Sequence, residues 1–318
     1  MDTLYLVIPC YNEEEVLPET SRRLVIKMGS LMEKGLISED SKVLLVNDGS
    51  KDRTWELISD LHKENPLFEG VKLSRNRGHQ NALLAGLLTA VNDADMIVSM
   101  DADLQDDINA VDEMVDDYHK GYDVVYGVRS KRETDTFFKR FTAEGFYKVM
   151  KALGVDIVFN HADYRLMSRR AVEGLAQFTE VNLFLRGIVP QIGYKWTTVT
   201  YERAERFAGE SKYPLKKMIA FAADGITSFS VKPIRLVFST GVVVFVVSLI
   251  MLIYALVAKL AGHTSVGWTS LMGSIWLIGG IQLLGLGVVG EYIGKIYNET
   301  KRRPRFIIES VLNKADNE

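Results

Sequence analysis

The chain is organised around the stretch Val98-Ser99-Met100-Asp101-Ala102-Asp103-Leu104-Gln105-Asp106-Asp107. The apolar run at its start, residues 96–100, predicts a buried strand. Because side chains alternate along an extended chain, Asp101 and Asp103 are expected to point the same way. Two carboxylates so placed suit a hard cation such as Mg2+ or Mn2+, with Gln105 as a further candidate ligand. An acidic pair also occurs at ordinary helix starts, so this interpretation depends on the rest of the chain.

Other short apolar runs end in polar clusters in the same manner. The runs cover residues 4–8, 42–46, 71–73 and 122–126, and the clusters after them cover residues 9–14, 47–54, 74–80 and 127–129. Helix-forming segments separate the runs, which predicts βαβ units and a mostly parallel sheet. Ligands bind outside the carboxyl ends of the strands in such sheets. We therefore expect a cleft there for a polar, anionic ligand together with a metal ion.

Two nucleotide-binding fingerprints are absent from the sequence. No Gly-x-Gly-x-x-Gly follows the first strand, and no Gly-x4-Gly-Lys-Ser/Thr occurs. A nucleoside diphosphate bridged by a metal remains a good candidate ligand, because the Asp carboxylates need a cation between them and the phosphates. The net charge of −3 argues against nucleic-acid binding, and a single cysteine, Cys10, excludes an intrachain disulfide. No basic segment or signal peptide precedes the first strand, so we expect the catalytic part in the cytosol.

Some of the polar residues have structural interpretations beside the functional ones. Asp48 either closes an Asx-turn in Asn-Asp-Gly-Ser or accepts hydrogen bonds from a base or ribose. Asn12 is alternatively the N-cap of the helix that follows it. Asp163 is either a general base at the mouth of the cleft or the ion-pair partner of Arg165 or Arg169.

The middle of the chain departs from simple strand–helix alternation. Residues 137–153 carry aromatic side chains at helical spacing with basic residues between them, which fits a helix on the sheet or a helix at the bilayer surface. Residues 194–203 alternate in polarity and predict a further strand. The polar and basic segment 202–213 is a candidate lid or a solvated linker.

Two segments near the C-terminus are long and apolar enough to cross a bilayer. Residues 236–258 and 264–290 contain no Asp, Glu, Lys or Arg, and each exceeds the roughly 20 residues that a spanning helix needs. Basic residues flank the pair at both outer ends, so the positive-inside rule places both ends in the cytosol. Glycines recur every seven residues from Gly273 to Gly294, which suits close helix packing within the hairpin or between protomers.

These patterns divide the chain into four expected parts. They are a cytosolic α/β domain at 1–213, an interfacial amphipathic helix at 214–234, a transmembrane hairpin at 235–295 with helices at about 236–258 and 267–290, and a cytosolic tail at 296–318. We expect a multi-pass protein of the inner (cytoplasmic) cell membrane with its catalytic domain and both termini in the cytosol.

The motifs taken together resemble those of a known family. Residues 8–14, 46–54 and 100–106 resemble the signature of family 2 glycosyltransferases with the Rossmann-like GT-A fold. Residues 163–170, the Arg206-x2-Gly209-x-Ser211-Lys212-Tyr213 loop and the hairpin are similar to those of polyprenyl-phosphate glycosyltransferases. Within that group they resemble the bactoprenol glucosyltransferases of the GtrB type, which are related to dolichol-phosphate mannose synthase. The Gln-x-x-Arg-Trp motif of processive synthases is absent, which favours transfer of a single sugar.

The resemblance implies a role for each matching residue. The nucleotide-sugar would be bound by Pro9, Tyr11, Asn12, Glu13, Asp48, Asn76, Arg77, Gly78, Asp101, Ala102 and Asp103, with Asp48 on the uracil. The metal ion would be bound by Asp101, Asp103 and Gln105. The donor diphosphate or the acceptor phosphate would be bound by Arg129, Arg140, Arg165, Arg206, Ser211 and Lys212. The catalytic carboxylates would be Asp163, near the reacting centre, and Asp103.

The implied activity is the inverting transfer of one sugar, glucose or a related hexose, from a UDP-sugar to polyprenyl (undecaprenyl) phosphate. The reaction would need Mg2+ or Mn2+ and would give a lipid-linked sugar for glycosylation of the cell envelope. Two alternatives stay open, a membrane-anchored nucleotide-sugar-binding or scaffold protein without turnover and a GDP-mannose-dependent mannosyltransferase. The expected partners are the UDP-sugar, the polyprenyl phosphate, the lipid bilayer and a second copy of the chain, and not nucleic acid.

Overall fold

The structure is a computed structural model that describes residues 1–103, 105–130, 161–181, 183–202, 227, 230–260 and 267–313. The helix expected at 137–153, the segment 203–213 and most of the expected interfacial helix lie outside these residues. The chain divides into two compact units, a sheet unit and a hairpin unit. The sheet unit contains residues 1–147, 156–214 and 303–318, and the hairpin unit contains residues 148–155 and 215–302.

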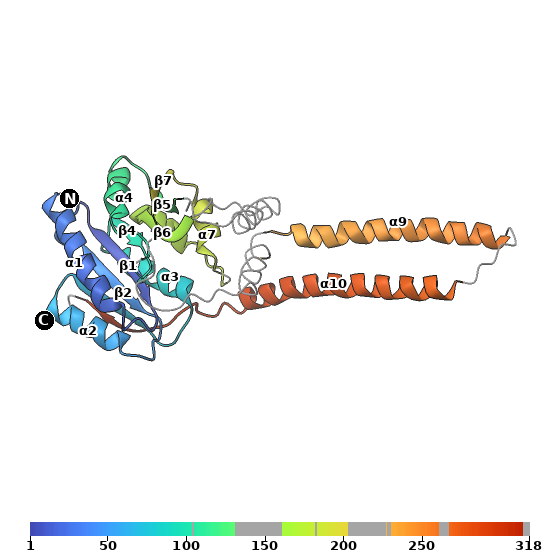
Figure 1. Cartoon of the computed structure of the whole chain (residues 1–318), viewed down its shortest axis with the longest axis horizontal. Coiled ribbons are helices and arrows are strands. Elements are labelled where there is room, and N and C mark those ends of the chain that lie inside the picture. The colour runs from blue at the N-terminus through green and yellow to red at the C-terminus, as the bar shows by residue number, and fades with distance from the viewer. Residues whose placement is uncertain are drawn as a thin grey trace. The chain divides into compact units, whose positions relative to one another are not determined.

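The sheet unit is an α/β structure in which strands alternate with helices (Figure 1). Its strands are β1 (Leu4–Cys10), β2 (Lys42–Asn47), β3 (Phe68–Leu73), β4 (Met96–Ser99), β5 (Val124–Arg129), β6 (His161–Ser168), β7 (Trp196–Tyr201) and β8 (Ile308–Leu312). Its helices are α1 (Leu17–Glu33), α2 (Thr54–Glu64), α3 (His79–Ala90), α4 (Ala110–His119), α6 (Arg169–Ala176), α7 (Leu185–Ile188) and the short 3-10 helix η1 (Val189–Ile192). The strands predicted from apolar runs are all present, and β3 begins three residues before its predicted start.

One eight-stranded sheet holds all these strands in the order β7-β5-β6-β4-β1-β2-β3-β8. Strands β1, β2, β3 and β4 pair in parallel, as do β5 and β7. The two exceptions are β6, which runs antiparallel to β4 and β5, and β8, which runs antiparallel to β3. The predicted mostly parallel α/β fold is confirmed, and its parallel strands place their carboxyl ends at one edge of the sheet.

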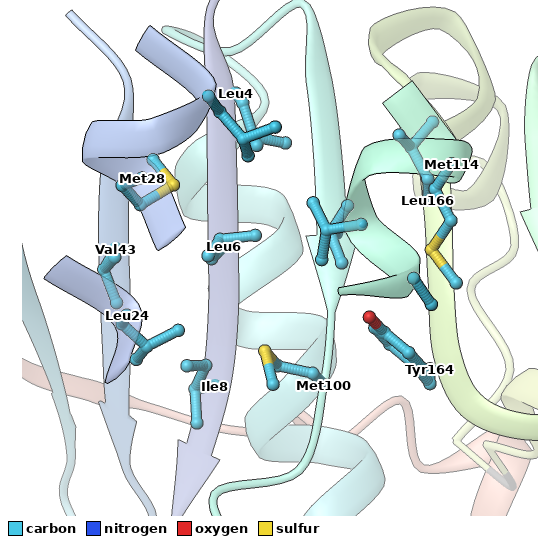
Figure 2. Close-up of a cluster of buried hydrophobic side chains, with 14 of the residues drawn as sticks. Leu4, Leu6, Ile8, Leu24, Met28, Val43, Met100, Met114, Tyr164 and Leu166 are labelled. Carbon is cyan, nitrogen blue, oxygen red and sulfur yellow. The ribbon is translucent and has the colours of Figure 1, made fainter. Parts of the chain in front are cut away.

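The central strand β1 is buried along its whole length, which explains why its sequence is continuously apolar rather than alternating. Leu4, Leu6 and Ile8 point to one face of the sheet, where Figure 2 shows them packed with Leu24 and Met28 of α1. The opposite face packs on α3. A methyl group built on Gly86 of that helix would come within 2.4 Å of Val7, so only glycine allows so close an approach.

The C-terminal residues 308–312, expected within a cytosolic tail, form the edge strand β8 of the sheet. Ser74 donates its backbone N–H to the carbonyl of Ile307 (3.0 Å), and Lys72 Nζ lies 2.8 Å from Glu309 Oε1. Arg305 donates to the backbone carbonyl of Phe178. Strand β8 therefore belongs to the same sheet as strand β1.

Ending the chain after residue 306 is expected to destabilise the sheet unit and to promote aggregation. The truncation removes β8 and leaves the edge of β3 unpaired, and such an edge is a template for pairing with other chains. We expect the unfolding midpoint in detergent to fall by roughly 5 °C or more, with an aggregate peak in size exclusion. The matched control ends after Asn313 and keeps β8; equal behaviour of both truncations would show that β8 contributes nothing.

Two long helices of the hairpin unit are described, α9 (Lys232–Leu260) and α10 (Trp268–Thr300), and they run side by side (Figure 1). Each contains a span long and apolar enough to cross a membrane, at Lys232–Met251 and Leu277–Thr300. Large apolar side chains point outward from the pair, with Phe238 73% and Leu284 74% exposed. Helices of a soluble core would cover such side chains with protein, so their exposure favours a lipid environment.

The glycine stripe of α10 leaves open space beside the helix at Gly280, Gly287 and Gly294. A methyl group built on Gly280, Gly287 or Gly294 would meet nothing within 4 Å. The close approach of the two helices falls at Gly285 instead, where a methyl group would lie 3.1 Å from Val237. Of the two roles predicted for the stripe, packing within the hairpin is therefore not seen at these three glycines.

Candidate functional site

The first two polar loops, residues 9–14 and 47–54, are hydrogen-bonded to each other at the carboxyl edge of the sheet. Asn12 donates its backbone N–H to Ser50 Oγ (3.0 Å), and its Oδ1 accepts from the backbone N–H of Lys51 (2.9 Å). The backbone N–H of Glu13 donates to Thr54 Oγ1 (2.9 Å). Asn12 adopts a φ of 55°, a left-handed conformation that asparagine tolerates better than most residues. Asn12 thus braces the loops, a role its sequence context did not indicate.

The Asp48 side chain binds the backbone of the third polar loop, residues 74–80, and does not close the turn in which Asp48 itself lies. Its Oδ1 accepts from the backbone N–H of Arg77 (2.7 Å) and its Oδ2 from that of Gly78 (2.9 Å). Burial raises the pKa of Asp48 even though these two hydrogen bonds oppose the rise. The Asx-turn suggested for Asp48 is instead made by Asn47, whose Oδ1 accepts from Ser50 N–H (3.2 Å). The buried carboxylate therefore sets the course of the chain into α3.

Gly49 sits where the second and third loops touch, and we expect Gly49→Ala to destabilise the site. Its φ is 64°, and a methyl group there would lie 2.4 Å from the backbone nitrogen of Asn76. Left-handed strain and collision together predict a loss of about 3 kcal/mol in the free energy of unfolding. Gly35→Ala is the matched control, because Gly35 has a φ of 67° but only an ordinary 3.4 Å contact. The control should lose about 1 kcal/mol; equal losses in both variants would contradict the collision.

The acidic loop after β4 brings Asp101 next to His79, the first residue of α3. His79 Nε2 lies 3.5 Å from Asp101 Oδ1. Thr20 of α1 donates its hydroxyl to the carbonyl of Ala102 (2.8 Å), and Asp103 Oδ1 accepts from the backbone N–H of Gln105 (3.2 Å). The loop is thus fixed to helices on both faces of the sheet, while Leu104 lies outside the described residues.

The donor set of this loop fits a hard divalent cation. Burial raises the pKa of Asp101, and the negative charges of Asp106, Asp163 and Asp103 raise it further against the opposing effect of His79. A cation would offset this concentration of negative charge. Among the described residues, no three His, Cys, Asp or Glu side chains are grouped as a metal site. In proteins a Mg2+ ion is commonly bound by one or two carboxylates, with substrate phosphates and water completing its shell.

Asp163 lies on β6 between two arginines. Arg165 Nη2 lies 2.8 Å from its Oδ1, and Arg186 donates through Nε (3.2 Å) and Nη2 (3.0 Å) to its two oxygens. Burial alone would raise the pKa of Asp163, but the guanidiniums of Arg186 and Arg165 outweigh it and hold that pKa well below its usual range. The predicted pairing of Asp163 with Arg165 is confirmed; Arg169 pairs with Asp95 instead.

Tyr201, Arg129 and Asp106 form a further polar cluster, which joins the acidic loop to the end of β7. Tyr201 donates its hydroxyl to Asp106 Oδ1 (2.5 Å), and Arg129 Nη2 lies 3.4 Å from the same oxygen. The side chain of Asp106 is only 1% exposed. Arg129, expected to bind an anionic ligand, therefore also neutralises a buried carboxylate in this structure.

The structure brings most of the expected site residues to one edge of the sheet. Asp101, Asp163 and the backbone around Gly78 gather within reach of His79. Arg165 is expected to bind phosphate, but its side chain is 2% exposed and engaged with Asp163. Four of the expected anion-binding residues lie outside the described part of the chain, namely Arg140, Arg206, Ser211 and Lys212.

Two residues at this edge had no role assigned from the sequence. His79 belongs to the polar cluster 74–80, and its position directly after Gly78 was the available signal. Arg186 lies on α7, a single helical turn whose sequence carries no periodicity, so nothing local pointed to it. Only the fold places it against Asp163, 23 residues away in the sequence.

Comparison with known proteins agrees with this architecture in both parts of the chain. The family profile described as glycosyl transferase family 2 matches residues 5–175, and the profile described as GtrB C-terminal hairpin matches residues 232–296. An α/β domain matched by the first profile and an apolar pair of helices matched by the second define the class, a glycosyltransferase with a C-terminal hairpin. The chain belongs to glycosyl transferase family 2, and it is an enzyme that transfers a sugar.

Relatives match along nearly the whole chain. A Bacillus subtilis protein named uncharacterized glycosyltransferase YkoT is 55% identical over 306 residues, covering 96% of this chain and 91% of the relative. An Escherichia coli protein named prophage bactoprenol glucosyl transferase homolog is 41% identical, covering 96% of this chain and 98% of the relative. The family predicted from the motifs is confirmed.

Solved structures resemble the chain more loosely. Glucosyl-3-phosphoglycerate synthase from Mycobacterium tuberculosis, crystallised with Mn2+, UDP and phosphoglyceric acid, is 18% identical with a TM-score of 0.43. The match covers 71% of this chain and 76% of that one. The fold assignment therefore rests on the family profile and the sheet order rather than on this likeness.

Proposed function

We propose that this glycosyltransferase moves one hexose, glucose in the first instance, from a UDP-sugar to the phosphate of a polyprenol, with inversion at the anomeric carbon. The observation that carries the proposal is a match to bactoprenol glucosyl transferases across both the sheet unit and the hairpin. The relative of that name from Shigella phage SfV is 39% identical over 314 residues, 97% of this chain. The product would be a lipid-linked sugar for glycosylation of the cell envelope.

The sheet edge would bind the donor. Pro9, Tyr11, Glu13 and Asp48 would line the nucleoside pocket, and the exposed ring of Tyr11 offers a face for stacking on the base. The loop of Asn76, Arg77 and Gly78, held by Asp48, would border the ribose and the diphosphate. The braces between the loops keep these groups in place before the donor arrives, which lowers the entropic cost of binding.

Asp101 and Asp103 would hold Mg2+ or Mn2+, with Gln105 as a further ligand. A bound divalent ion supplies electrostatic stabilisation for charge on the departing diphosphate. The acceptor phosphate is already anionic near neutral pH, so it can attack the anomeric carbon without a strong general base. Asp163 stays ionised between its arginines and would organise charge at the reacting centre rather than remove a proton.

The hairpin would hold the enzyme at the membrane in which its acceptor is dissolved, which raises the local concentration of that acceptor. The basic residues that flank the hairpin favour the cytosolic side for both of its ends. Strand β8 supports the same orientation, because the chain leaves the sheet before α9 and joins it again after α10. The domain 1–213 and both termini would therefore lie in the cytosol, with 214–234 along the membrane surface.

A transfer assay tests the proposal directly. Purified full-length protein in detergent is given undecaprenyl phosphate, Mn2+ or Mg2+, and a panel of labelled UDP- and GDP-sugars, and label is counted in the organic extract. Labelled lipid from UDP-glucose, lost on adding EDTA, is the expected result. Labelled lipid from GDP-mannose and not from UDP-glucose would show that the donor is GDP-mannose. Nucleotide binding without label from any donor would support a binding or scaffold protein instead.

A further inference from the structure

The carboxylate of Asp163 is bound by two arginines. One carboxylate is shared by two guanidiniums, since Arg165 binds Oδ1 and Arg186 binds both oxygens through its Nε and Nη2. The three side chains together carry a charge of about +1, because an ionised Asp contributes −1 and each Arg +1. A carboxylate engaged in this way is already saturated by cations, so it has little remaining capacity to act on a substrate as a base.

The two arginines differ in their access to solvent. The side chain of Arg165 is 2% exposed, and its Nη1 also donates to the carbonyl of Leu185 (3.5 Å). The side chain of Arg186 is 29% exposed while it keeps its two-point contact with Asp163. Of the two guanidiniums bound to Asp163, the one of Arg186 is therefore the one that reaches solvent.

The position of Arg186 is set by its neighbour in the chain. The backbone N–H of Leu185 donates to Gln80 Oε1 (3.0 Å), and the carbonyl of Leu185 accepts from Arg165. These contacts fix the backbone beside Arg186 to α3 and β6, and Asp163 then fixes the guanidinium itself. A side chain held at both ends loses little entropy when it binds a further group.

The Asp163 carboxylate that holds Arg186 lies close to the acidic loop. His79 Nε2 is 3.5 Å from Asp101 Oδ1 and 3.9 Å from Asp163 Oδ2, so a single imidazole spans the distance between the loop and the cluster. Two anionic substrates must meet at this edge in the proposed reaction, and their repulsion requires fixed positive charge nearby. Guanidinium is the side chain best suited to bind phosphate oxygens in a defined direction.

We propose that Arg186 binds a phosphate oxygen of a substrate at this edge, with Asp163 acting as the residue that positions Arg186. The inference rests on the proposed function and extends it by naming a binding residue and by reversing the roles within the pair. The phosphate belongs either to the polyprenyl acceptor or to the donor diphosphate, and binding measurements separate the two. A purely structural Arg186 would neutralise Asp163 without contacting either substrate.

The test compares Arg186→Gln and Arg186→Lys with a matched control. Arg170→Gln removes the other two-point arginine–aspartate pair, in which Arg170 binds Asp123 at the opposite edge of the sheet. Each variant is measured for the KM of undecaprenyl phosphate in transfer, for binding of UDP with Mn2+, and for binding of farnesyl phosphate by calorimetry. Thermal unfolding and UDP binding report whether each variant is folded.

In Arg186→Gln the acceptor KM and the dissociation constant of farnesyl phosphate are expected to rise about 10- to 100-fold, while UDP binding stays within about twofold. Arg186→Lys keeps the positive charge but lacks the planar guanidinium, so it should restore part of the acceptor affinity that Arg186→Gln loses. Weaker UDP binding with an unchanged acceptor KM would assign the oxygen to the donor diphosphate. If Arg186→Gln does not fold, the acceptor KM and the dissociation constants of farnesyl phosphate and UDP are measured for Arg186→Lys instead and test the same inference.

Two outcomes separate the inference from the proposed function. If wild-type protein transfers sugar and Arg186→Gln shows the wild-type acceptor KM and UDP affinity, the inference is overturned and the proposed function stands. If wild-type protein binds farnesyl phosphate through Arg186 but transfers no sugar from any donor, the proposed function fails and the binding residue stands. A loss of the same size in Arg170→Gln would show an effect of stability alone and would also overturn the inference.

Discussion

Asp103→Ala is expected to abolish sugar transfer while leaving the sheet unit folded. Asp103 belongs to a loop and not to a strand or helix, and its Oδ1 accepts a local hydrogen bond from the backbone N–H of Gln105. Its proposed role is to hold a divalent cation that offsets charge on the leaving diphosphate. Removing stabilisation of this kind typically costs about 10²–10³-fold in rate, so the residual transfer should fall to background in the labelled-lipid assay.

Asp103→Asn sharpens this prediction because it keeps an oxygen for the hydrogen bond to Gln105 and removes only the charge. Its transfer rate should be nearly as low as that of the Ala variant, and it should need more Mn2+ for half-maximal activity. Asp107→Asn is the control in the same loop, because Asp107 accepts from the backbone N–H of Asn109 at the approach to α4. Wild-type transfer by Asp103→Asn would exclude Asp103 as a metal ligand.

Asp163→Ala is expected to destabilise the protein strongly as well as to end transfer. It leaves Arg165 buried without its carboxylate, and breaking a buried pair in this way costs about 3–5 kcal/mol. The Asp163→Leu/Arg165→Met double variant replaces the pair by apolar groups and should recover much of the stability. It should not recover transfer, because Arg186 then lacks the group that positions it. Transfer by the double variant at the wild-type rate would contradict any role of the cluster in the reaction.

The low pKa of Asp163 gives this prediction a definite pH dependence. Arg186, Arg165 and His79 face its carboxylate, and the pKa is lower in the folded protein than the ordinary value of about 3.9. The stabilisation is therefore fully present above about pH 4 and is lost as the pH falls further toward the folded pKa. An imidazole can change its charge between pH 5 and pH 8, and His79 Nε2 lies 3.9 Å from Asp163 Oδ2, so the comparison is made in a His79→Gln background. There the effect of Asp163→Asn on the free energy of unfolding should be constant from about pH 5 to pH 8. A difference that grows within this range would show that Asp163 titrates there.

Most of the predictions that the structure confirms came from patterns within single short segments of the sequence. Apolar runs such as 4–8 and 42–46 predicted strands of a parallel sheet, because burial on both faces requires continuous apolar sequence. The hairpin followed from the two segments without charges, since a membrane imposes length and polarity on each helix separately. These are local constraints, and a single segment of sequence is enough to reveal them.

Contacts between distant segments could not be predicted in the same way. Nothing in residues 308–312 indicates pairing with β3, because an edge strand needs only a compatible pattern and not a specific sequence. The sequence around Asp48 indicated an Asx-turn or a hydrogen bond to a base or ribose, and nothing in it indicated that the carboxylate binds the backbone of a loop about 30 residues later. The orientation of β6, antiparallel between β4 and β5, likewise depends on the connections and not on its composition.

The acidic loop could be predicted from the sequence, whereas the Asp163 cluster could not. The position of Asp101 and Asp103 after a buried strand was evident from the sequence, because the end of a parallel strand places them at the ligand-binding edge. The chemical character of Asp163 was not evident, because a carboxylate is a base or a permanent anion according to its neighbours. Those neighbours are Arg165, two residues away, and Arg186, which folding alone brings to it, and together they hold the charge on Asp163.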